Sequence, residues 1–302
     1  MSKHTYVVTG ATGRVGSRVA RGLLDAGHRV NAIGRNPERL RALADLGATA
    51  FQGDVRDAGF VHRSFAAADA ALLVVSEDPA SRDVRRDVGD VAINYANALR
   101  TNNVPFAVFI SSIGSHDERY RGFVLVHTDV EKSLDAVPDL NVVHLRAGFF
   151  FENLFYWLPR IQTHGTLAVP IDPDAGFDMV PAGDVATAAV RRLLGLDFRG
   201  KSAIELRGRE VLTMRQVADR VSRQLGTPVP VERLTREADV ENLVAHGLSN
   251  DEIAAAMVLS PTTAKTHVSR AMIKLGARDR AQLVVFAYQA GLVSPRDPAP
   301  PR

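Results

Sequence analysis

The sequence predicts an α/β fold with a doubly wound parallel sheet, followed by a small all-α domain of four helices. Two observations lead to this prediction. Over about the first 110 residues, short apolar runs alternate with helical patterns, and repeated β–α–β units with buried strands are typical of parallel sheets. Beyond the proline-containing segment 226–237 the strand patterns stop, and only helical patterns follow.

Five strands and three helices account for most of the first 112 residues. The expected strands are the apolar runs at residues 5–10, 29–34, 48–54, 68–76 and 105–112. The expected helices are one with Val15, Val19, Leu23 and Leu24 on one side, a second over residues 38–47, and a long one through Val84, Val88, Ile93, Ala96 and Leu99.

The composition narrows the chemistry that is open to this chain. It has no cysteine, which excludes disulfides, iron–sulfur clusters, Cys-ligated zinc and thiol-based redox sensing. His144 and His164 have no partners at metal-ligand spacing, so no metal site is expected. No apolar run is long enough to span a membrane and the N-terminus lacks signal-peptide features, so we expect a cytoplasmic protein that does not bind membranes.

The first β–α turn reads Gly10-Ala-Thr-Gly13-Arg-Val-Gly16 and has the spacing of a nucleotide-binding turn. Small residues let the backbone approach a pyrophosphate at a helix N-terminus, where free N–H groups and the helix dipole favour anions. The alternative is a tight turn with a purely structural role. The residues expected to bind the nucleotide in this Rossmann-type unit are Gly10, Thr12, Gly13, Arg14, Val15 and Gly16.

The end of the second strand indicates which nucleotide binds. A site for NAD(H) usually has Asp or Glu there, whereas this chain has Arg35, which suits a 2′-phosphate, and Arg14 adds positive charge nearby. NADP(H) is therefore favoured and NAD(H) is the alternative. Arg35 could also be a solvent-exposed side chain near a helix start that has no role in binding. Asp54, just after the third strand, is expected either to accept a hydrogen bond from the adenine or to cap the next helix.

Four segments together give a family resemblance: GATGRVG, GRNPERL, GDVRD and LRAGFFFEN. Over about residues 4–225 the chain resembles the NmrA-like group of atypical short-chain dehydrogenase/reductases. Some members of that group are NAD(P)H-dependent reductases, and others bind the dinucleotide without turning it over and act as regulators. The resemblance also places the aromatic segment 149–157 beside the nicotinamide, as a pocket wall; ordinary core or a dimer contact is the alternative.

The catalytic positions of the resemblance decide between these two roles. Active short-chain reductases use a Tyr acid and a Lys four residues later, and extended relatives add a Glu four residues after that. Here Glu131 occupies the Glu position, His127 the Lys position and Phe123 the Tyr position. We therefore expect a domain that binds NADP(H) without efficient catalysis, with Ser111 and His127 near the cofactor. The alternative is an active NADPH-dependent reductase of quinone-type acceptors, because hydride transfer to an activated acceptor needs less help from an acid.

The C-terminal part has the pattern of a helix-turn-helix. Ser249 and Glu252 form a capping box for a short helix, and Ser260 with Pro261 begins a longer one. In the longer helix Ala264, Val268, Met272 and Leu275 form an apolar stripe, while basic and hydroxyl side chains lie on the outer side. Asp279 is expected to cap the last helix.

Motifs across residues 234–293 resemble the LuxR-type DNA-binding domain: LTRE, GLSNDEIA, SPTTAKTHVSR and KLGARDRAQ. Departures are a missing residue within LTRE, Glu241 at a commonly apolar position and Ala264 in place of Val. The resemblance implies double-stranded DNA as a partner, as an inverted repeat bound by a homodimer. The residues it places at the groove or near phosphates are Ser260, Thr262, Thr263, Lys265, Thr266, His267, Ser269, Arg270 and Lys274.

The sequence thus predicts an NAD(P)-binding domain over residues 1–227, a linker over 228–233, the helix-turn-helix domain over 234–293 and a disordered tail over 294–302. The favoured function is a transcription regulator whose first domain senses NADP(H). A reductase with an appended DNA-binding domain, or a protein-interaction module in place of the sensor, is the alternative.

Overall fold

The structure is a computed structural model that describes residues 3–76, 81, 83–117, 123–169 and 171–233. It also describes isolated positions further on: 244, 249, 250, 253, 265, 268, 269, 272, 273, 276–279, 281, 282, 284 and 285. These residues belong to two compact units. The first takes its described residues from 1–76, 85–153 and 178–210, and the second from 77–84, 154–177 and 211–302.

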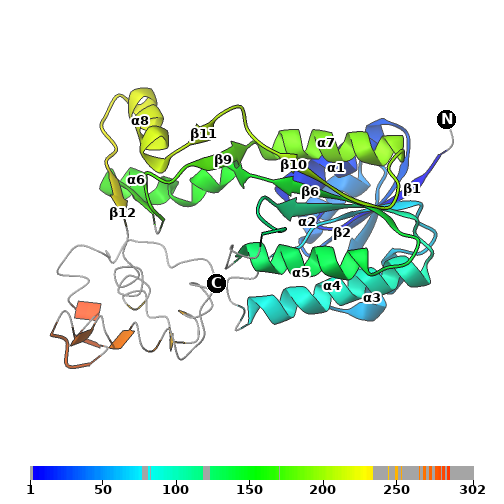
Figure 1. Ribbon diagram of the computed structural model, residues 1–302, viewed down its shortest axis with the longest axis horizontal. Coiled ribbons are helices and arrows are strands. Elements are labelled where there is room, and N and C mark those ends of the chain that lie inside the picture. Colours follow the sequence, from blue (N-terminus) through cyan, green and yellow to red (C-terminus); the bar gives the residue numbers. More distant parts are fainter. Residues whose placement is uncertain are drawn as a thin grey trace. The chain divides into compact units, whose positions relative to one another are not determined.

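A seven-stranded parallel sheet forms the centre of the first unit (Figure 1). Its strand order is β10-β6-β5-β4-β1-β2-β3, so the direction of winding reverses between β1 and β4. This confirms the predicted doubly wound sheet, and each of the five predicted strands is present: β2 has the predicted bounds and the other four are shorter than predicted. The strands are β1 (Thr5–Val8), β2 (Arg29–Gly34), β3 (Thr49–Gln52), β4 (Ala70–Leu73), β5 (Phe106–Ser112), β6 (Asn141–Ala147) and β10 (Lys201–Leu206).

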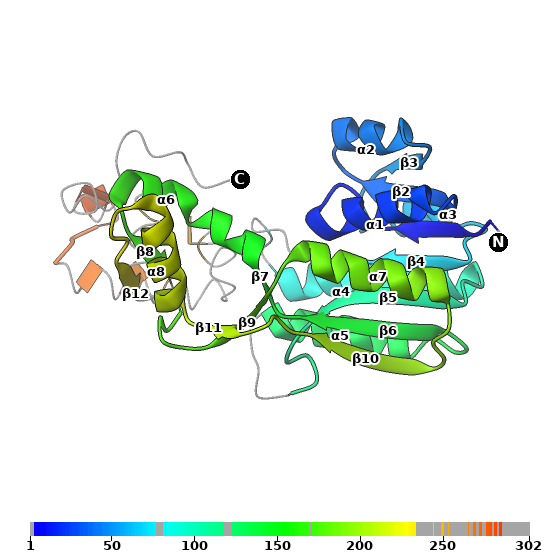
Figure 2. The ribbon, with the colours of Figure 1, turned by 90° about the horizontal axis from the view of Figure 1, so that it is seen from above.

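Helices cover both faces of this sheet (Figure 1, Figure 2). One face carries α1 (Arg14–Asp25), α2 (Pro37–Ala44) and α7 (Ala182–Gly195). The other carries α3 (Ala58–Ser64), α4 (Val84–Thr101) and α5 (Phe123–Asp135). Side-chain caps fix two of the starts: Asn36 accepts from the Arg39 amide at α2, and Asp57 accepts from the Phe60 amide at α3.

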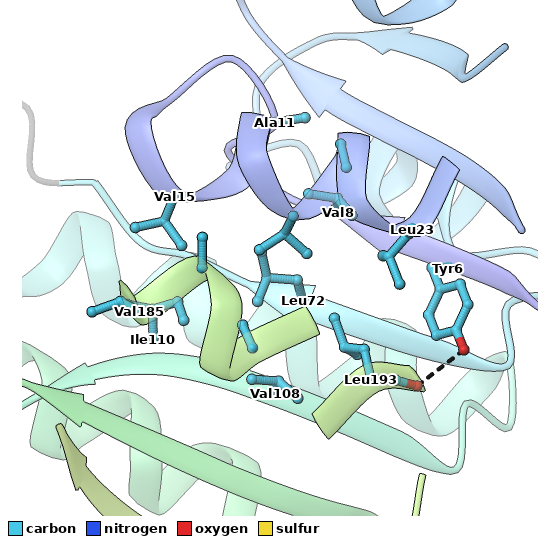
Figure 3. Packing of buried hydrophobic residues seen from close by; sticks show 14 of the residues in the cluster. Tyr6, Val8, Ala11, Val15, Leu23, Leu72, Val108, Ile110, Val185 and Leu193 are labelled. Atoms are coloured by element: carbon cyan, nitrogen blue, oxygen red, sulfur yellow. Dashed lines mark hydrogen bonds between the residues drawn. The ribbon is translucent and has the colours of Figure 1, made fainter. Parts of the chain in front are cut away.

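The core of the first unit lies between the sheet and the packed pair α1 and α7 (Figure 3). Gly22 lets the two helices approach, because a Cβ there would lie 3.0 Å from Val190. The fully buried Tyr6 donates from its hydroxyl to the Leu193 carbonyl at 3.0 Å, near the end of α7. Burial raises the pKa of Tyr6 to about 12, so this hydroxyl stays protonated and keeps its hydrogen bond at ordinary pH.

In α4 one residue expected along the helix does not reach the core. Ile93 is 55% exposed, whereas Tyr95 is fully buried and donates to the Val74 carbonyl at 2.9 Å. The buried positions Val88, Ala92, Tyr95 and Leu99 follow the spacing of a helix face, and Ile93 lies one residue off that face. The position of a residue in the helical repeat therefore predicted burial along this helix better than its apolar character did.

The second unit contains short elements that we describe by themselves. The strand β8 (Leu167–Val169) pairs in parallel with β12 (Val231–Arg233), so the segment predicted as a linker includes a strand. Thr213 and Gln216 form a capping box at the start of α8 (Met214–Leu225), which ends at Gly226 in the left-handed region. The remaining elements near this part of the chain are β7 (Phe149–Phe150), the 3-10 helix η1 (Phe151–Tyr156), α6 (Leu158–His164), β9 (Phe177–Val180) and β11 (Val211–Leu212).

Within the predicted helix-turn-helix, the structure describes only isolated residues. Val244, Ile253 and Val268 are buried, and Lys265 is exposed. Asp279 accepts a hydrogen bond from the Gln282 amide at 2.8 Å, as expected of a helix cap. The arrangement of the four helices lies outside the described residues and stays a prediction. None of the described helices has the length and apolar character that a membrane span requires.

Candidate active site

The glycine turn between β1 and α1 is tight at each of its glycines. Gly10 has a φ of +59°, a region that side chains disfavour, and packs on Val74. A Cβ on Gly16 would lie 2.2 Å from the Gly10 carbonyl oxygen, and one on Gly13 would lie 3.2 Å from it. The α1 helix begins without a side-chain cap and has no acidic residue in its first turn, which leaves its N-terminus suited to an anion.

This turn lies where the sheet reverses its winding. The Thr9 hydroxyl at the end of β1 accepts from the Val74 amide at 2.8 Å, and the Thr9 amide donates to the Leu72 carbonyl of β4 at 3.0 Å. Ligands of doubly wound proteins bind outside the carboxyl ends of the strands at such a point. The structure therefore places the predicted nucleotide turn at the position that this fold class uses for binding.

Three arginines are attached close to the glycine turn. Gly34 ends β2 so near to Thr12 that a Cβ there would lie 2.6 Å from the Thr12 methyl group, and Arg35 follows directly. Arg14 is part of the turn, and Arg39 donates to the Thr12 carbonyl at 3.1 Å. The sequence interpretation missed Arg39, although its place in the first turn of a helix that follows the second strand was a signal that it lies near Arg35.

Asp54 follows β3 and is hydrogen-bonded to Arg56, two residues further along the chain. It accepts from the Arg56 amide at 2.9 Å and from the Arg56 guanidinium at 3.1 and 2.7 Å. These hydrogen bonds from Arg56 hold the pKa of Asp54 below its ordinary value. Of the two predicted roles, capping of the next helix is not observed, because Asp57 caps α3.

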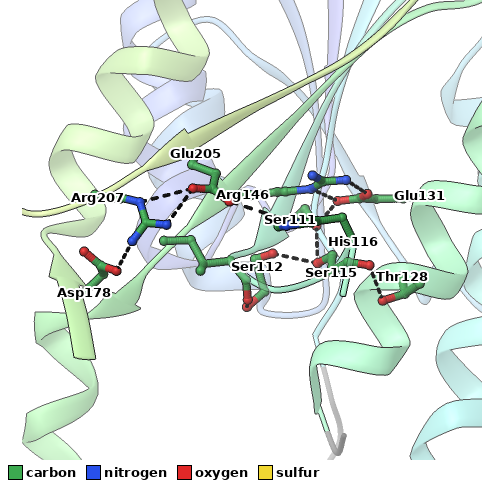
Figure 4. A network of polar contacts seen from close by, with 11 residues as sticks. Ser111, Ser112, Ser115, His116, Thr128, Glu131, Arg146, Asp178, Glu205 and Arg207 are labelled. Carbon is green, nitrogen blue, oxygen red and sulfur yellow. Dashed lines mark hydrogen bonds and ion pairs between the residues drawn. The ribbon is translucent and has the colours of Figure 1, made fainter. Parts of the chain in front are cut away.

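A buried polar network lies at the carboxyl end of β5 (Figure 4). Ser111, predicted to lie near the nicotinamide, is only 3% exposed and donates from its hydroxyl to Glu131 at 2.6 Å. Arg146 of β6 donates to the same carboxylate at 3.0 and 2.6 Å. The half-exposed Ser112, next along the strand, donates from its hydroxyl to the Ile113 carbonyl at 3.2 Å and is the more accessible of the two hydroxyls at this end of β5.

The positions equivalent to the Tyr–Lys–Glu series lie on α5. Phe123 begins the helix, and its side chain lies outside what the structure describes, as does Tyr120. The half-buried His127 has its ring 6.1 Å from the ring of Phe109. Burial alone would raise the pKa of Glu131, but the hydrogen bonds from Arg146 and Ser111 outweigh it and the pKa lies below its ordinary value. Glu131 is thus a charged member of a buried pair.

Two side chains tie the start of the aromatic segment 149–157 to the first unit. Asn153 accepts from the Arg14 guanidinium at 3.2 Å, and Glu152 accepts from the Ala182 amide at the start of α7 at 3.0 and 3.2 Å. No residue of η1 is buried, and Phe155 and Tyr156 are 63% and 72% exposed. The alternative of ordinary core is therefore wrong for η1, because these rings remain open to solvent.

Among the residues predicted to contact DNA, the structure describes two. Lys265 is exposed and Ser269 is half-buried. The others lie outside the described residues: Ser260, Thr262, Thr263, Thr266, His267, Arg270 and Lys274.

Comparison with known families decides the membership of this chain. Residues 2–274 match the model of the NmrA-like family. The chain belongs to the NmrA-like family. The match extends beyond residue 225, where the resemblance in the sequence ended, so it includes the expected linker and part of the expected helix-turn-helix.

Several known proteins are similar to this NmrA-like chain. It is 32% identical over 241 residues to a (4-alkanoyl-5-oxo-2,5-dihydrofuran-3-yl)methyl phosphate reductase of Streptomyces griseus, which covers 79% of this chain and 80% of that protein. The crystal structure of an NADPH-dependent quinone oxidoreductase of Escherichia coli with NADPH is 25% identical, with a TM-score of 0.70 over 95% of this chain and 94% of that one. A Bacillus subtilis transcriptional regulatory protein is 47% identical over 58 residues, 19% of this chain and 27% of that protein.

These relatives correct one expectation. The prediction of a non-catalytic domain is wrong, because the relatives that match most of the chain are reductases. The missing Tyr–Lys pair was too strict a criterion. An acceptor that is already electron-poor takes up a hydride without an acid held on α5, so Phe123 and His127 do not exclude turnover.

Proposed function

We propose that this NmrA-like protein is a reductase that transfers a hydride from NADPH to an electron-poor, quinone-type acceptor. The observation that carries the proposal is the glycine turn, in which a Cβ on Gly16 would lie 2.2 Å from the Gly10 carbonyl oxygen at the reversal point of the sheet. Such a turn leaves backbone space that a pyrophosphate fits. The reductases that match most of the chain support the same function.

NADP(H) is the cofactor that the site fits. Gly10, Thr12, Gly13, Val15 and Gly16 would surround its pyrophosphate at the start of α1. Arg35 and Arg39 would hold the 2′-phosphate, since guanidinium groups form strong charge-assisted hydrogen bonds with phosphate. When bound, the cofactor supplies the hydride. Ser112 ends β5, where the acceptor would be oriented, and His127 of α5 would lie near the cofactor. A quinone-type acceptor leaves an oxyanion stable enough to take its proton from water.

Arg35 and Arg39 give a test of cofactor choice. Arg35→Gln and Arg39→Gln are each expected to raise the Kd for NADPH by about 10- to 100-fold, because each removes a charged hydrogen bond that contributes roughly 1.5–3 kcal/mol. The Kd for NADH should stay within a factor of about two in the same variants. Fluorescence titration of both dinucleotides measures the effect.

Arg41→Gln is the matched control, since Arg41 is an exposed arginine of the same helix, two residues beyond Arg39. Equal loss of NADPH and NADH affinity in Arg35→Gln would show that the 2′-phosphate is not bound there.

The reductase proposal itself is tested by NADPH oxidation with a panel of quinones and activated alkenes. Absence of oxidation with every acceptor would refute it.

We infer a second function, binding of double-stranded DNA by a LuxR-type segment at residues 234–293. Its support is the 47% identity over 58 residues to a transcriptional regulatory protein, and 46% over 63 residues to the response regulator VraR of Staphylococcus aureus. The alternation of the exposed Lys265 with the buried Val268 agrees with a helix that has one apolar and one polar side. A homodimer on an inverted repeat, with half-sites about one helical turn apart, is part of this proposal.

Lys265 tests the DNA-binding proposal. Lys265→Ala is expected to weaken binding to a selected operator by about 1–3 kcal/mol while leaving the Kd for NADPH unchanged. Electrophoretic or fluorescence binding assays at fixed salt, with and without NADPH, measure both affinities. Arg223→Ala removes one exposed charge from α8 and is the control. Equal weakening by the two variants would mean that the segment binds DNA only through net charge.

A further inference from the structure

Glu131 and Arg146 form a buried ion pair between α5 and β6, beside the proposed active site (Figure 4). The guanidinium donates two hydrogen bonds to the carboxylate, and the two side chains are only 7% and 17% exposed. Removing two charges from water is costly, and well-packed apolar residues in the same place are often at least as stable. Stability alone therefore does not account for a charged pair at this position.

A second pair joins the same two elements and allows a comparison. Asp135, one helical turn after Glu131, accepts a hydrogen bond at 2.8 Å from the ring of His144, which lies two residues before Arg146 on β6. This pair also joins α5 to the sheet, although the Asp135 side chain is 44% exposed whereas that of Glu131 is 7% exposed. Among the hydrogen bonds of the described residues, neither the Asp135 nor the His144 side chain joins the end of β5.

The Glu131–Arg146 pair does join the end of β5, through Ser111. The Ser111 hydroxyl donates to Glu131 at 2.6 Å and lies 3.1 Å from the Ser115 hydroxyl. Ser115 in turn donates to the Ser112 carbonyl at 2.6 Å, and its own carbonyl accepts from Thr128 of α5 at 2.7 Å. Ser111 and Ser115, four residues apart, are thus each hydrogen-bonded to α5.

We propose that the Glu131–Arg146 pair is a positioning device for residues 112–116, which hold the acceptor end of the site. The Glu131 carboxylate accepts the hydrogen bond from Ser111, which leaves the Ser111 oxygen to accept from the Ser115 hydroxyl across their 3.1 Å contact and so fixes Ser115 and the turn that presents Ser112. Arg146 keeps the carboxylate charged and in place. Glu131 and Arg146 are positioning residues, because they act on the reaction through this loop. The inference rests on the proposed reductase function for its kinetic consequence, but its structural consequence is independent of it.

The test compares Glu131→Gln with Asp135→Asn, which breaks the neighbouring α5–β6 pair. In Glu131→Gln we expect kcat/KM for NADPH-dependent reduction to fall about 10- to 100-fold, since small misplacements of positioning groups have effects of this size. Hydrogen exchange of the Ser115 and Asp117 amides, which close the turn, should accelerate in the same variant. Asp135→Asn removes a charge that acts on Arg146 only through space, so it should change both quantities far less, even where the urea midpoint of this variant falls by as much.

A double variant adds an internal check. Ser111→Ala should reproduce the kinetic loss of Glu131→Gln, and the two changes together should do no more than either alone, because they break one chain of contacts. Additive losses, or equal losses in Asp135→Asn, would overturn the inference. If the unaltered protein oxidised no NADPH, the proposed function would fail. The hydrogen-exchange rates of the Ser115 and Asp117 amides would still test the positioning role. Unchanged rates in Glu131→Gln would refute that role.

Discussion

Gly16→Ala is expected to lose at least about a hundredfold in affinity for NADPH. The added Cβ would lie 2.2 Å from the carbonyl oxygen and 2.7 Å from the carbonyl carbon of Gly10, and neither is a flexible side-chain end that moves aside. The turn must open, and the amides at the start of α1 then no longer converge on the phosphates. Losing two charged hydrogen bonds of roughly 1.5–3 kcal/mol each gives this magnitude. Fluorescence titration with NADPH measures it.

Gly89→Ala makes the same chemical change at a harmless place. A Cβ on Gly89, within α4, meets nothing within 4 Å. This variant should bind NADPH normally and be up to about 1 kcal/mol more stable, because alanine favours helices over glycine. Normal NADPH affinity in Gly16→Ala would mean that the cofactor does not bind at this turn.

Arg146→Met is expected to destabilise the protein by about 3–5 kcal/mol, the usual cost of leaving a buried charge without its partner. Only the Ser111 hydroxyl would then remain to the Glu131 carboxylate among the hydrogen bonds of the described residues. The double variant Glu131→Leu with Arg146→Met should recover most of that loss, because it removes both charges. Urea unfolding measures both values, and a double variant no more stable than Arg146→Met would contradict the argument.

The same variant has a distinctive dependence on pH. In the unaltered protein the pKa of Glu131 lies below its ordinary value of 4.5, so the pair contributes stability above about pH 4.5 that is lost as the pH falls further. Without Arg146, burial dominates and raises the pKa of Glu131, so its penalty is greatest at neutral pH and is relieved on protonation. The difference in stability between the two proteins should therefore shrink between pH 7 and pH 4.

The cofactor turn was readable from the sequence because its determinants are local. Gly10, Gly13 and Gly16 act within seven residues of one another, and their spacing after a strand and before a helix is sufficient to identify the turn. The fold class, a doubly wound parallel sheet, could be predicted for the same reason, because the strands and the helix of each β–α–β unit follow one another directly in the chain. Glu131 shows the limit. Its spacing from Phe123 and His127 on α5 predicted a place in a catalytic series, but its role depends on Arg146, fifteen residues away on the strand β6.

By itself, then, the sequence determined five of the seven strands of the sheet, the nucleotide turn and the positive charge of Arg35. These depend on periodicity, on glycine geometry and on residues that are neighbours in the chain. The tertiary structure alone decided that Arg39 reaches the turn, that Tyr95 and not Ile93 enters the core, and that Ser111 donates a hydrogen bond to a buried carboxylate. Each of these depends on which side chains are in contact across packed helices and strands, and those contacts cannot be read from a single sequence.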